Sequence, residues 1–269
     1  MIALLCAFAP LAAHAHGDVH EAIVALTKQI AASPADAKLY LRRGELHRAH
    51  QDWAPAGADY DKAAELDPAL TVVDLARGEM LGEAGRADAA KEALDRFLAR
   101  RPDHSAGYAA RARMFAKAMS WQAAEEDFSK AIAHTKEPEP ALFIERSRAL
   151  RALDRGDDAI RTLDEGIARL GPLIVLMQPA TDLEAEAGRL DAALVRLGKV
   201  IAASPRKERW LLRRGDLLEK AGRIESAREA FTAAQSALAA VPADRRATAA
   251  MQDLSKSIDA ALARIPPAK

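Results

Sequence analysis

Small and apolar residues recur along this chain every 34 or 35 positions. In the first occurrence a small residue lies at Gly44, an alanine at Ala56, and a large apolar residue at Tyr60. The same three positions recur at Gly78, Ala90 and Leu94; Ala112, Ala124 and Phe128; Ser147, Ala159 and Leu163; Thr181, Ala193 and Leu197; and Gly215, Ala227 and Phe231. Small residues on two facing helices let their backbones approach, and the large residue fills the space beside the crossing. The pattern therefore predicts six pairs of packed helices.

The ends and irregularities of these helices can also be predicted. Gly85, Gly188 and Gly222 lie between the two helices of a pair, where a left-handed residue ends the first helix. Pro179 lies inside the first helix of the fifth pair, so we expect that helix to start late or to kink. One extra residue near "HTKEPEPAL" predicts a longer loop between the third and fourth pairs.

The composition agrees with an all-helical chain. Ala, Leu, Arg, Glu and Lys dominate, aromatic residues make up only 4%, and no run alternates Val, Ile and Thr as a strand would. The 39 basic and 39 acidic residues balance. Because nucleic-acid binding draws its affinity mainly from basic side chains, we expect no nucleic-acid partner. No later stretch is long and apolar enough to predict a membrane span.

The chain resembles the tetratricopeptide repeat family over residues 37–242. In the first repeat, the family's signature positions are occupied by Tyr40, Gly44, His47, Ala56, Tyr60, Ala63 and Pro68. The resemblance implies an all-α, right-handed superhelical solenoid of about six helix-turn-helix units. Solenoids need polar-backed caps at both ends. We expect residues 16–36 to form an N-terminal capping helix, and residues 243–269 to form a capping helix, continuous from Ala243 to Ile265, with a short tail.

The first residues, "MIALLCAFAPLAAHA", have a different character. Ile2 to Ala13 is apolar but too short to span a membrane, and it ends in an A-x-A cleavage pattern at Ala13, His14 and Ala15. We expect residues 1–15 to be a signal peptide cleaved after Ala15, which makes the chain an exported bacterial protein, periplasmic or secreted. Cleavage would remove Cys6, the one cysteine, and with it all thiol chemistry.

The resemblance implies a concave groove, lined by the first helix of each repeat, that binds another protein or a peptide. Its central side chains are basic and its flanks acidic, so we expect a partner with an acidic segment, held by arginines. The acidic flank in the sixth repeat includes Asp216 and Glu219. The candidate contact residues are Arg48, Glu79, Arg113, Lys117, Arg148 and Arg151. The alternative is an ordinary solvated face with salt pairs along the helices.

The sequence also bears on two other classes of function. A metal-handling role, for copper or zinc, would use His16 at the mature N-terminus and His20 one turn later. Catalysis has no motif to support it, since the chain lacks a phosphate-binding glycine loop, G-x-S-x-G and H-E-x-x-H. The chain also contains no asparagine, so the carboxylate clamp that some tetratricopeptide proteins use is not recognisable. We expect a non-enzymatic adaptor or assembly factor that needs no cofactor.

Overall fold

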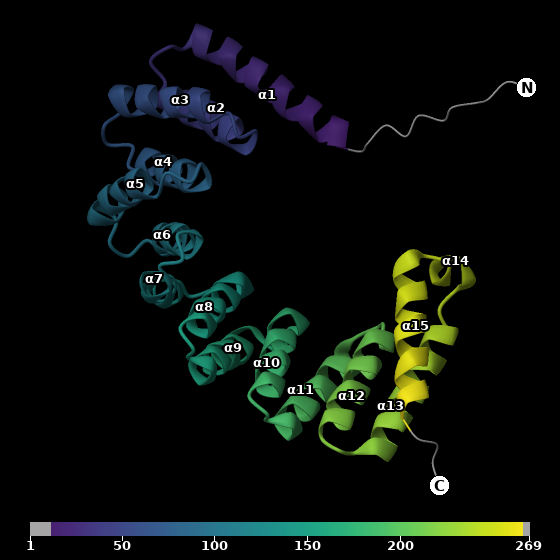
Figure 1. Ribbon diagram of the computed structural model, residues 1–269. Coiled ribbons are helices and arrows are strands. Elements are labelled where there is room, and N and C mark those ends of the chain that lie inside the picture. Colours follow the sequence, from purple (N-terminus) through teal and green to yellow (C-terminus); the bar gives the residue numbers. More distant parts are fainter. Residues whose placement is uncertain (1–11, 266–269) are drawn as a thin grey trace, which may run out of the picture. The chain divides into compact units, whose positions relative to one another are not determined.

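The structure, a computed structural model, describes residues 12–265, with side chains from residue 19 onward (Figure 1). Within this range all regular elements are helices and none is a strand, as the composition predicts. The six predicted repeats are six helix pairs, each joined by a short turn. They are α2 (Ala37–Ala49) with α3 (Trp53–Leu66), α4 (Val72–Glu83) with α5 (Ala87–Arg100), α6 (Ser105–Lys117) with α7 (Trp121–Ala133), α8 (Pro140–Ala152) with α9 (Gly156–Leu170), α10 (Ile174–Glu186) with α11 (Leu190–Ala203), and α12 (Glu208–Lys220) with α13 (Ile224–Ala239).

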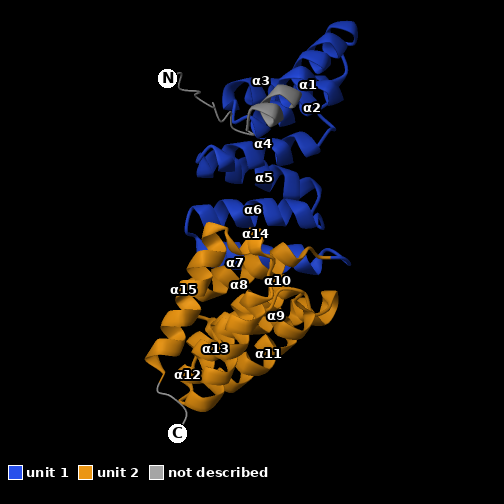
Figure 2. Cartoon of the chain, turned by 90° about the vertical axis from the view of Figure 1, so that its right-hand side faces the viewer, with its two compact units in different colours: residues 1–137 blue, residues 138–269 orange. Residues whose placement is uncertain are grey.

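The chain divides into two compact units of three repeats each (Figure 2). The N-terminal unit comprises residues 1–137 and the C-terminal unit residues 138–269. The loop that joins α7 to α8, residues 134–139, is the longest between consecutive repeats, as the extra residue near "HTKEPEPAL" predicts.

Close packing within each pair follows the predicted spacing. The alanines of all six repeats, Ala56 to Ala227, are fully buried. A methyl group added to Gly44 would lie 2.6 Å from Cε1 of Tyr60, and one added to Gly215 would lie 2.3 Å from Cε1 of Phe231. The small residue on the first helix therefore receives the large side chain of the second helix directly.

The turn inside every repeat contains one residue with positive φ. Three are the predicted glycines, with φ of +76° at Gly85, +75° at Gly188 and +72° at Gly222. The equivalent positions of the other three repeats are not glycine but Gln51, Met119 and Asp154, with φ between +56° and +63°. The left-handed turn is thus common to all six repeats, although only three of them have glycine, which adopts this conformation most easily.

The fifth repeat departs from the expectation of a late start. α10 begins at Ile174, at the same offset from Thr181 as Ala37 has from Gly44, and it runs through Pro179. Leu176 and Met177 in its first turns are almost fully buried, and their packing holds the helix together. Pro179 has no N–H, so the carbonyl of Val175 cannot receive its usual helical hydrogen bond.

Both ends of the repeat array carry additional helices. α1 (Ala12–Ala32) packs on α2 and buries Leu26 and Ile30. At the other end the expected continuous helix is wrong, because α14 (Ala243–Arg246) and α15 (Ala249–Arg264) are separated by an extended Thr248. Residues 242–250 are all exposed, so no burial favours a helix that continues through Thr248. The hydroxyl of Thr248 donates to the carbonyl oxygen of Arg245 at 2.8 Å, at the end of α14.

Candidate functional site

In the N-terminal unit the predicted contact residues do lie together. They surround a hollow of about 310 Å³ whose walls come from α2, α4 and α6. The residues that line it are Arg48, Gly78, Glu79, Gly82, Glu83, Ala110, Arg113, Met114 and Lys117. Four of the six candidates from the sequence are thus brought to one place.

The charges in this hollow are already engaged with one another. Nη1 of Arg48 lies 2.9 Å from Oε2 of Glu79 and 2.8 Å from Oε1 of Glu83. Nζ of Lys117 donates to the carbonyl oxygens of Gly82 at 3.0 Å and of Glu83 at 2.7 Å, which satisfies the carbonyl end of α4. These cations stabilise the stack of first helices.

The position of Glu79 in the hollow disfavours the charged form of its carboxyl group. Burial raises the pKa of its carboxyl above the ordinary value, although the guanidinium groups of Arg48 and Arg113 act in the opposite direction. The carboxylate is therefore partly desolvated and only partly compensated by the two arginines. A further anion would enter a site that already holds two carboxylates, Glu79 and Glu83.

The C-terminal unit contains a larger groove, which we call the arginine groove. Its volume is about 710 Å³, and α8, α10 and α12 supply most of its lining. The lining includes Ile144, Arg148, Arg151, Val175, Gln178, Pro179, Asp182, Glu186, Arg209, Trp210 and Arg213. The remaining two sequence candidates, Arg148 and Arg151, are therefore both in this groove.

Two ion pairs tie the three first helices of the arginine groove together. Nη2 of Arg151 on α8 lies 2.9 Å from Oε1 of Glu186 on α10. Nη2 of Arg213 on α12 lies 2.9 Å from Oδ1 of Asp182 on α10. The side chains of Arg151 and Glu186 are 61% and 52% exposed, so solvent screens this pair and a competing anion can reach it.

Two further arginines in the groove have no such partner. Arg148 on α8 and Arg209 on α12 are exposed, and neither has an acidic partner among residues 19–265. Between them lies an apolar surface that includes Val175, which is 51% exposed, and Pro179. The groove therefore combines unneutralised cations with uncovered apolar area.

The sequence did not single out Arg209, Trp210 or Val175. It placed the contacts of the sixth repeat further along the helix, at positions that include Asp216 and Glu219. Those two carboxylates instead form ion pairs with Arg264 of α15, at 3.1 Å and 2.6 Å, and so attach the C-terminal capping helix to α12. The groove residues lie about two turns earlier on α12, and Trp210, one of three tryptophans, was the available signal.

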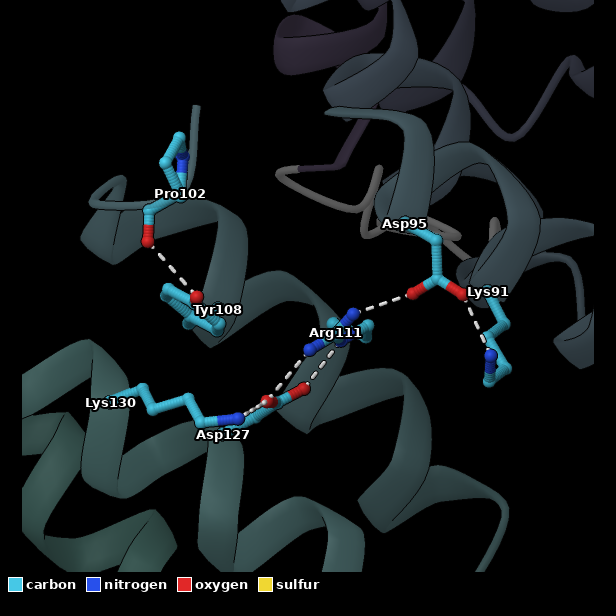
Figure 3. Close-up of polar contacts among 7 residues, drawn as sticks. All are labelled: Lys91, Asp95, Pro102, Tyr108, Arg111, Asp127 and Lys130. Carbon is cyan, nitrogen blue, oxygen red and sulfur yellow. Dashed lines mark hydrogen bonds and ion pairs between the residues drawn. The ribbon is translucent and has the colours of Figure 1, made fainter. Parts of the chain in front are cut away.

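A second set of arginines makes contacts outside the two hollows, and Figure 3 shows those of Arg111. Nε and Nη2 of Arg111 donate to the two carboxylate oxygens of Asp127 at 2.6 Å and 2.9 Å, and Nη1 donates to Asp95 at 2.5 Å. These hydrogen bonds raise the pKa of Arg111, which stays charged. Arg43 makes the same bidentate contact with Asp59 in the first repeat, at 2.8 Å and 2.6 Å.

In the fifth repeat this contact is reversed in charge. Ala180 stands where the other repeats have an arginine of the Arg111 kind, and Arg196 stands where the third repeat has its aspartate. Arg196 binds Glu184 at 2.5 Å and 3.0 Å and Asp164 of the preceding repeat at 2.8 Å. Since the contact persists with its partners exchanged, we interpret it as a structural link between repeats.

The other sequence candidates remain without support in the described residues. Among residues 19–265 no group of three or more His, Cys, Asp and Glu side chains could hold a metal ion. His20 is exposed on α1, whereas the side chain of His16 lies outside the described range, as do Cys6 and the rest of residues 1–11. No helix in residues 12–265 has the length and apolar character to cross a membrane.

Solved structures with the same fold come from several bacteria. The C-terminal part of a TPR repeat-containing protein from Cytophaga hutchinsonii matches with a TM-score of 0.68 and 16% identity, over 89% of this chain and 95% of that one. A tetratricopeptide repeat protein from Parabacteroides merdae matches with a TM-score of 0.54 and 18% identity, over 91% and 93%. Pseudomonas aeruginosa PilF matches with a TM-score of 0.57 and 13% identity, over 82% and 97%. At such identities the likeness concerns the fold.

The sequence itself identifies the family. No curated protein matches the chain. The family model described as tetratricopeptide repeat, however, matches residues 75–141 and 182–250, which together are half of the chain. These segments contain the small, alanine and large positions of the second, third and sixth repeats. The chain therefore belongs to the tetratricopeptide repeat family.

Proposed function

We propose that this protein is an adaptor or assembly factor that holds a segment of a partner protein, with acidic side chains, in the arginine groove. The tetratricopeptide fold is that of a protein–protein interaction module, generally without enzymatic activity. One observation carries the finer proposal. Arg148 and Arg209 are exposed without acidic partners, on either side of an uncovered apolar surface.

The charge of the groove favours an acidic partner. Four arginines line it against two carboxylates, those of Asp182 and Glu186, so the lining has an excess of positive charge. A guanidinium that already faces solvent loses little when a carboxylate replaces its water, and it can bind both carboxylate oxygens. The groove is open for such an exchange, whereas the cations of the N-terminal hollow already have partners.

The difference between the arginine groove and the N-terminal hollow narrows the set of proposed contact residues. Arg148 and Arg209 carry the proposal, joined by Arg151 and Trp210. Arg48, Glu79 and Lys117 contribute to the packing of the first helices, and we assign them no partner contact.

The proposal is tested by selecting peptides from a random displayed library on the full chain. Selected peptides are then titrated against the unchanged protein and against two variants. Arg148→Glu with Arg151→Glu reverses charge in the groove, while Arg214→Glu makes the same kind of change at an exposed arginine of α12 outside the groove. We expect the double variant to lose at least tenfold in affinity and Arg214→Glu to lose little. Equal binding by all three proteins would refute the assignment to this groove.

We also propose that the protein is exported, with residues 1–15 removed. The support is the apolar run and the A-x-A pattern of the sequence. Mass spectrometry of the protein from a bacterial periplasmic extract is expected to show a chain that begins at His16. Recovery from the cytoplasm with residues 1–15 intact would contradict the proposal.

A further inference from the structure

The distribution of charge across the arginine groove constrains what a partner segment looks like. From this distribution we infer that the groove selects an extended segment with an acidic residue, an apolar residue and a second acidic residue at alternate positions. This inference rests on the proposed function, since it specifies the ligand of the same groove. It is carried by three rows of side chains, one on each first helix.

The two outer rows supply the anion contacts. Arg148 comes from α8 and Arg209 from α12, and both are without acidic partners in the described chain. α10 lies between these helices, because it is ion-paired with α8 through Glu186 and with α12 through Asp182. The partner therefore meets one available guanidinium at each side of the groove.

The middle row disfavours a carboxylate and favours an apolar side chain. α10 presents Asp182 and Glu186, which already hold the guanidinium groups of Arg213 and Arg151, so a partner carboxylate over this helix would have to compete with them. It also presents the half-exposed Val175 and the ring of Pro179. Trp210 completes this surface, and the hydrogen bond from its Nε1 to Oγ of Ser204, at 3.1 Å, holds the indole in place.

The width of the groove sets the spacing of the segment. Packed helices lie about 8–10 Å apart, so with α10 between them the axes of α8 and α12 are at least about 16–20 Å apart. Arg148 follows the small position Ser147 by one residue, whereas Arg209 precedes Gly215 by six, so the two arginines are also offset along the helices by about 10 Å. The long side chains of Arg148 and Arg209 reduce the distance that the partner must cover. An extended chain advances about 3.3 Å per residue, so positions i and i+4 are about 13 Å apart. Positions i, i+2 and i+4 also face the same side of an extended chain, which gives the order acidic, apolar, acidic.

The inference can be tested with four synthetic peptides. Each has blocked ends, and the reference sequence in one-letter code is GGEGLGEGG. In the first control both acids become glutamine, in the second leucine becomes serine, and in the third one acid moves to the position beside leucine. Binding is followed by anisotropy of a labelled peptide on the unchanged full chain. A second readout is Trp210 fluorescence in a Trp53→Phe, Trp121→Phe variant, which leaves Trp210 as the single tryptophan.

We expect the reference peptide to bind at least tenfold more tightly than each of the three controls. Arg148→Glu and Arg209→Glu should each weaken its binding at least tenfold, whereas Arg214→Glu should change it less than threefold. Circular dichroism of the variants serves as the control for folding, since all three arginines are exposed.

Failure of this inference is distinguishable from failure of the proposed function. If the displayed library yields peptides that depend on Arg148 and Arg151 but lack the alternating pattern, the inference is overturned and the proposed function stands. Equal binding of the glutamine and reference peptides also overturns the inference. If neither the library nor the synthetic peptides give any binding that depends on the groove, both are overturned.

Discussion

Replacing Met119 by glycine is expected to stabilise the protein, although methionine is the larger and more apolar residue. Met119 has φ of +56° in the turn between α6 and α7, and the residue is 74% exposed. The equivalent residues in the second, fifth and sixth repeats are glycines with φ of +72° to +76°. The substitution therefore converts the third repeat to the solution that half of the repeats already use.

The magnitude follows from two opposing contributions. A residue with a Cβ in the left-handed region costs about 1–2 kcal/mol relative to the right-handed region. Glycine offsets part of this stabilisation, because it loses more backbone freedom on folding, which costs about 0.5–1 kcal/mol. Little burial is lost, since Met119 is mostly exposed. We expect a net stabilisation of about 0.5–1 kcal/mol.

The reciprocal substitution provides a matched control. Gly222 has φ of +72°, and a methyl group built on it would meet no atom within 4 Å. Gly222→Ala therefore introduces the backbone penalty without a steric clash and removes the extra backbone freedom of glycine, so it should destabilise the protein by about 0.5–1 kcal/mol.

Both variants are measured by urea unfolding followed by helical circular dichroism. Free energies of unfolding are compared only where the variants show the same dependence of free energy on urea concentration, because arrays of repeats can depart from two-state behaviour. We expect the two midpoints to move in opposite directions. A lower midpoint for Met119→Gly, or no loss for Gly222→Ala, would refute the reasoning from backbone conformation.

Three further predictions concern packing and charge. Gly215→Ala should destabilise the protein by at least about 1–3 kcal/mol, because the new methyl group would lie 2.3 Å from Cε1 of Phe231; unfolding in urea measures it. Asp127→Asn should lower the free energy of unfolding by about 2–3 kcal/mol, because the largely buried Arg111 keeps only Asp95 as a charged partner. A double-mutant cycle with Arg111→Met should give a favourable coupling energy between Arg111 and Asp127. Burial raises the pKa of Glu79, so the contribution of its protonated form to stability is lost as pH rises through the folded-state pKa. Glu79→Gln should therefore be as stable as the unchanged protein, or more stable, at neutral pH. Urea unfolding over a pH series measures this, and a large loss of unfolding free energy in the variant at neutral pH would contradict it.

The fold could be predicted from the sequence to within a few residues. The spacing of Gly44, Ala56 and Tyr60 is a packing constraint that repeats, and a repeated constraint is hard to satisfy in any other way. The errors lie where the constraint does not apply. The segment around Thr248 has no packing partner, and the start of α10 depends on the burial of Leu176 and Met177 rather than on Pro179.

The candidate site was predicted less completely. Spacing places Arg48 and Arg151 at equivalent positions of their helices, with Arg148 about one turn before Arg151, but it does not tell which carboxylates each arginine meets. That depends on neighbouring repeats, where Arg48 finds Glu79 and Glu83 while Arg148 finds none. The pairing of charges between helices is a tertiary property, so the sequence identifies the cations and the structure identifies which of them are available.

The reversed contact of the fifth repeat has a consequence for how the repeats can be ordered. If α11 were exchanged for α7, the carboxylate of Asp127 would replace Arg196 and would meet two other carboxylates, those of Glu184 and Asp164. Repeats of similar shape are therefore not interchangeable, and a stack with a repeat skipped, or with one borrowed from a second chain, would place like charges together at this junction. The sequence of stacking is specified by charge as well as by the covalent chain.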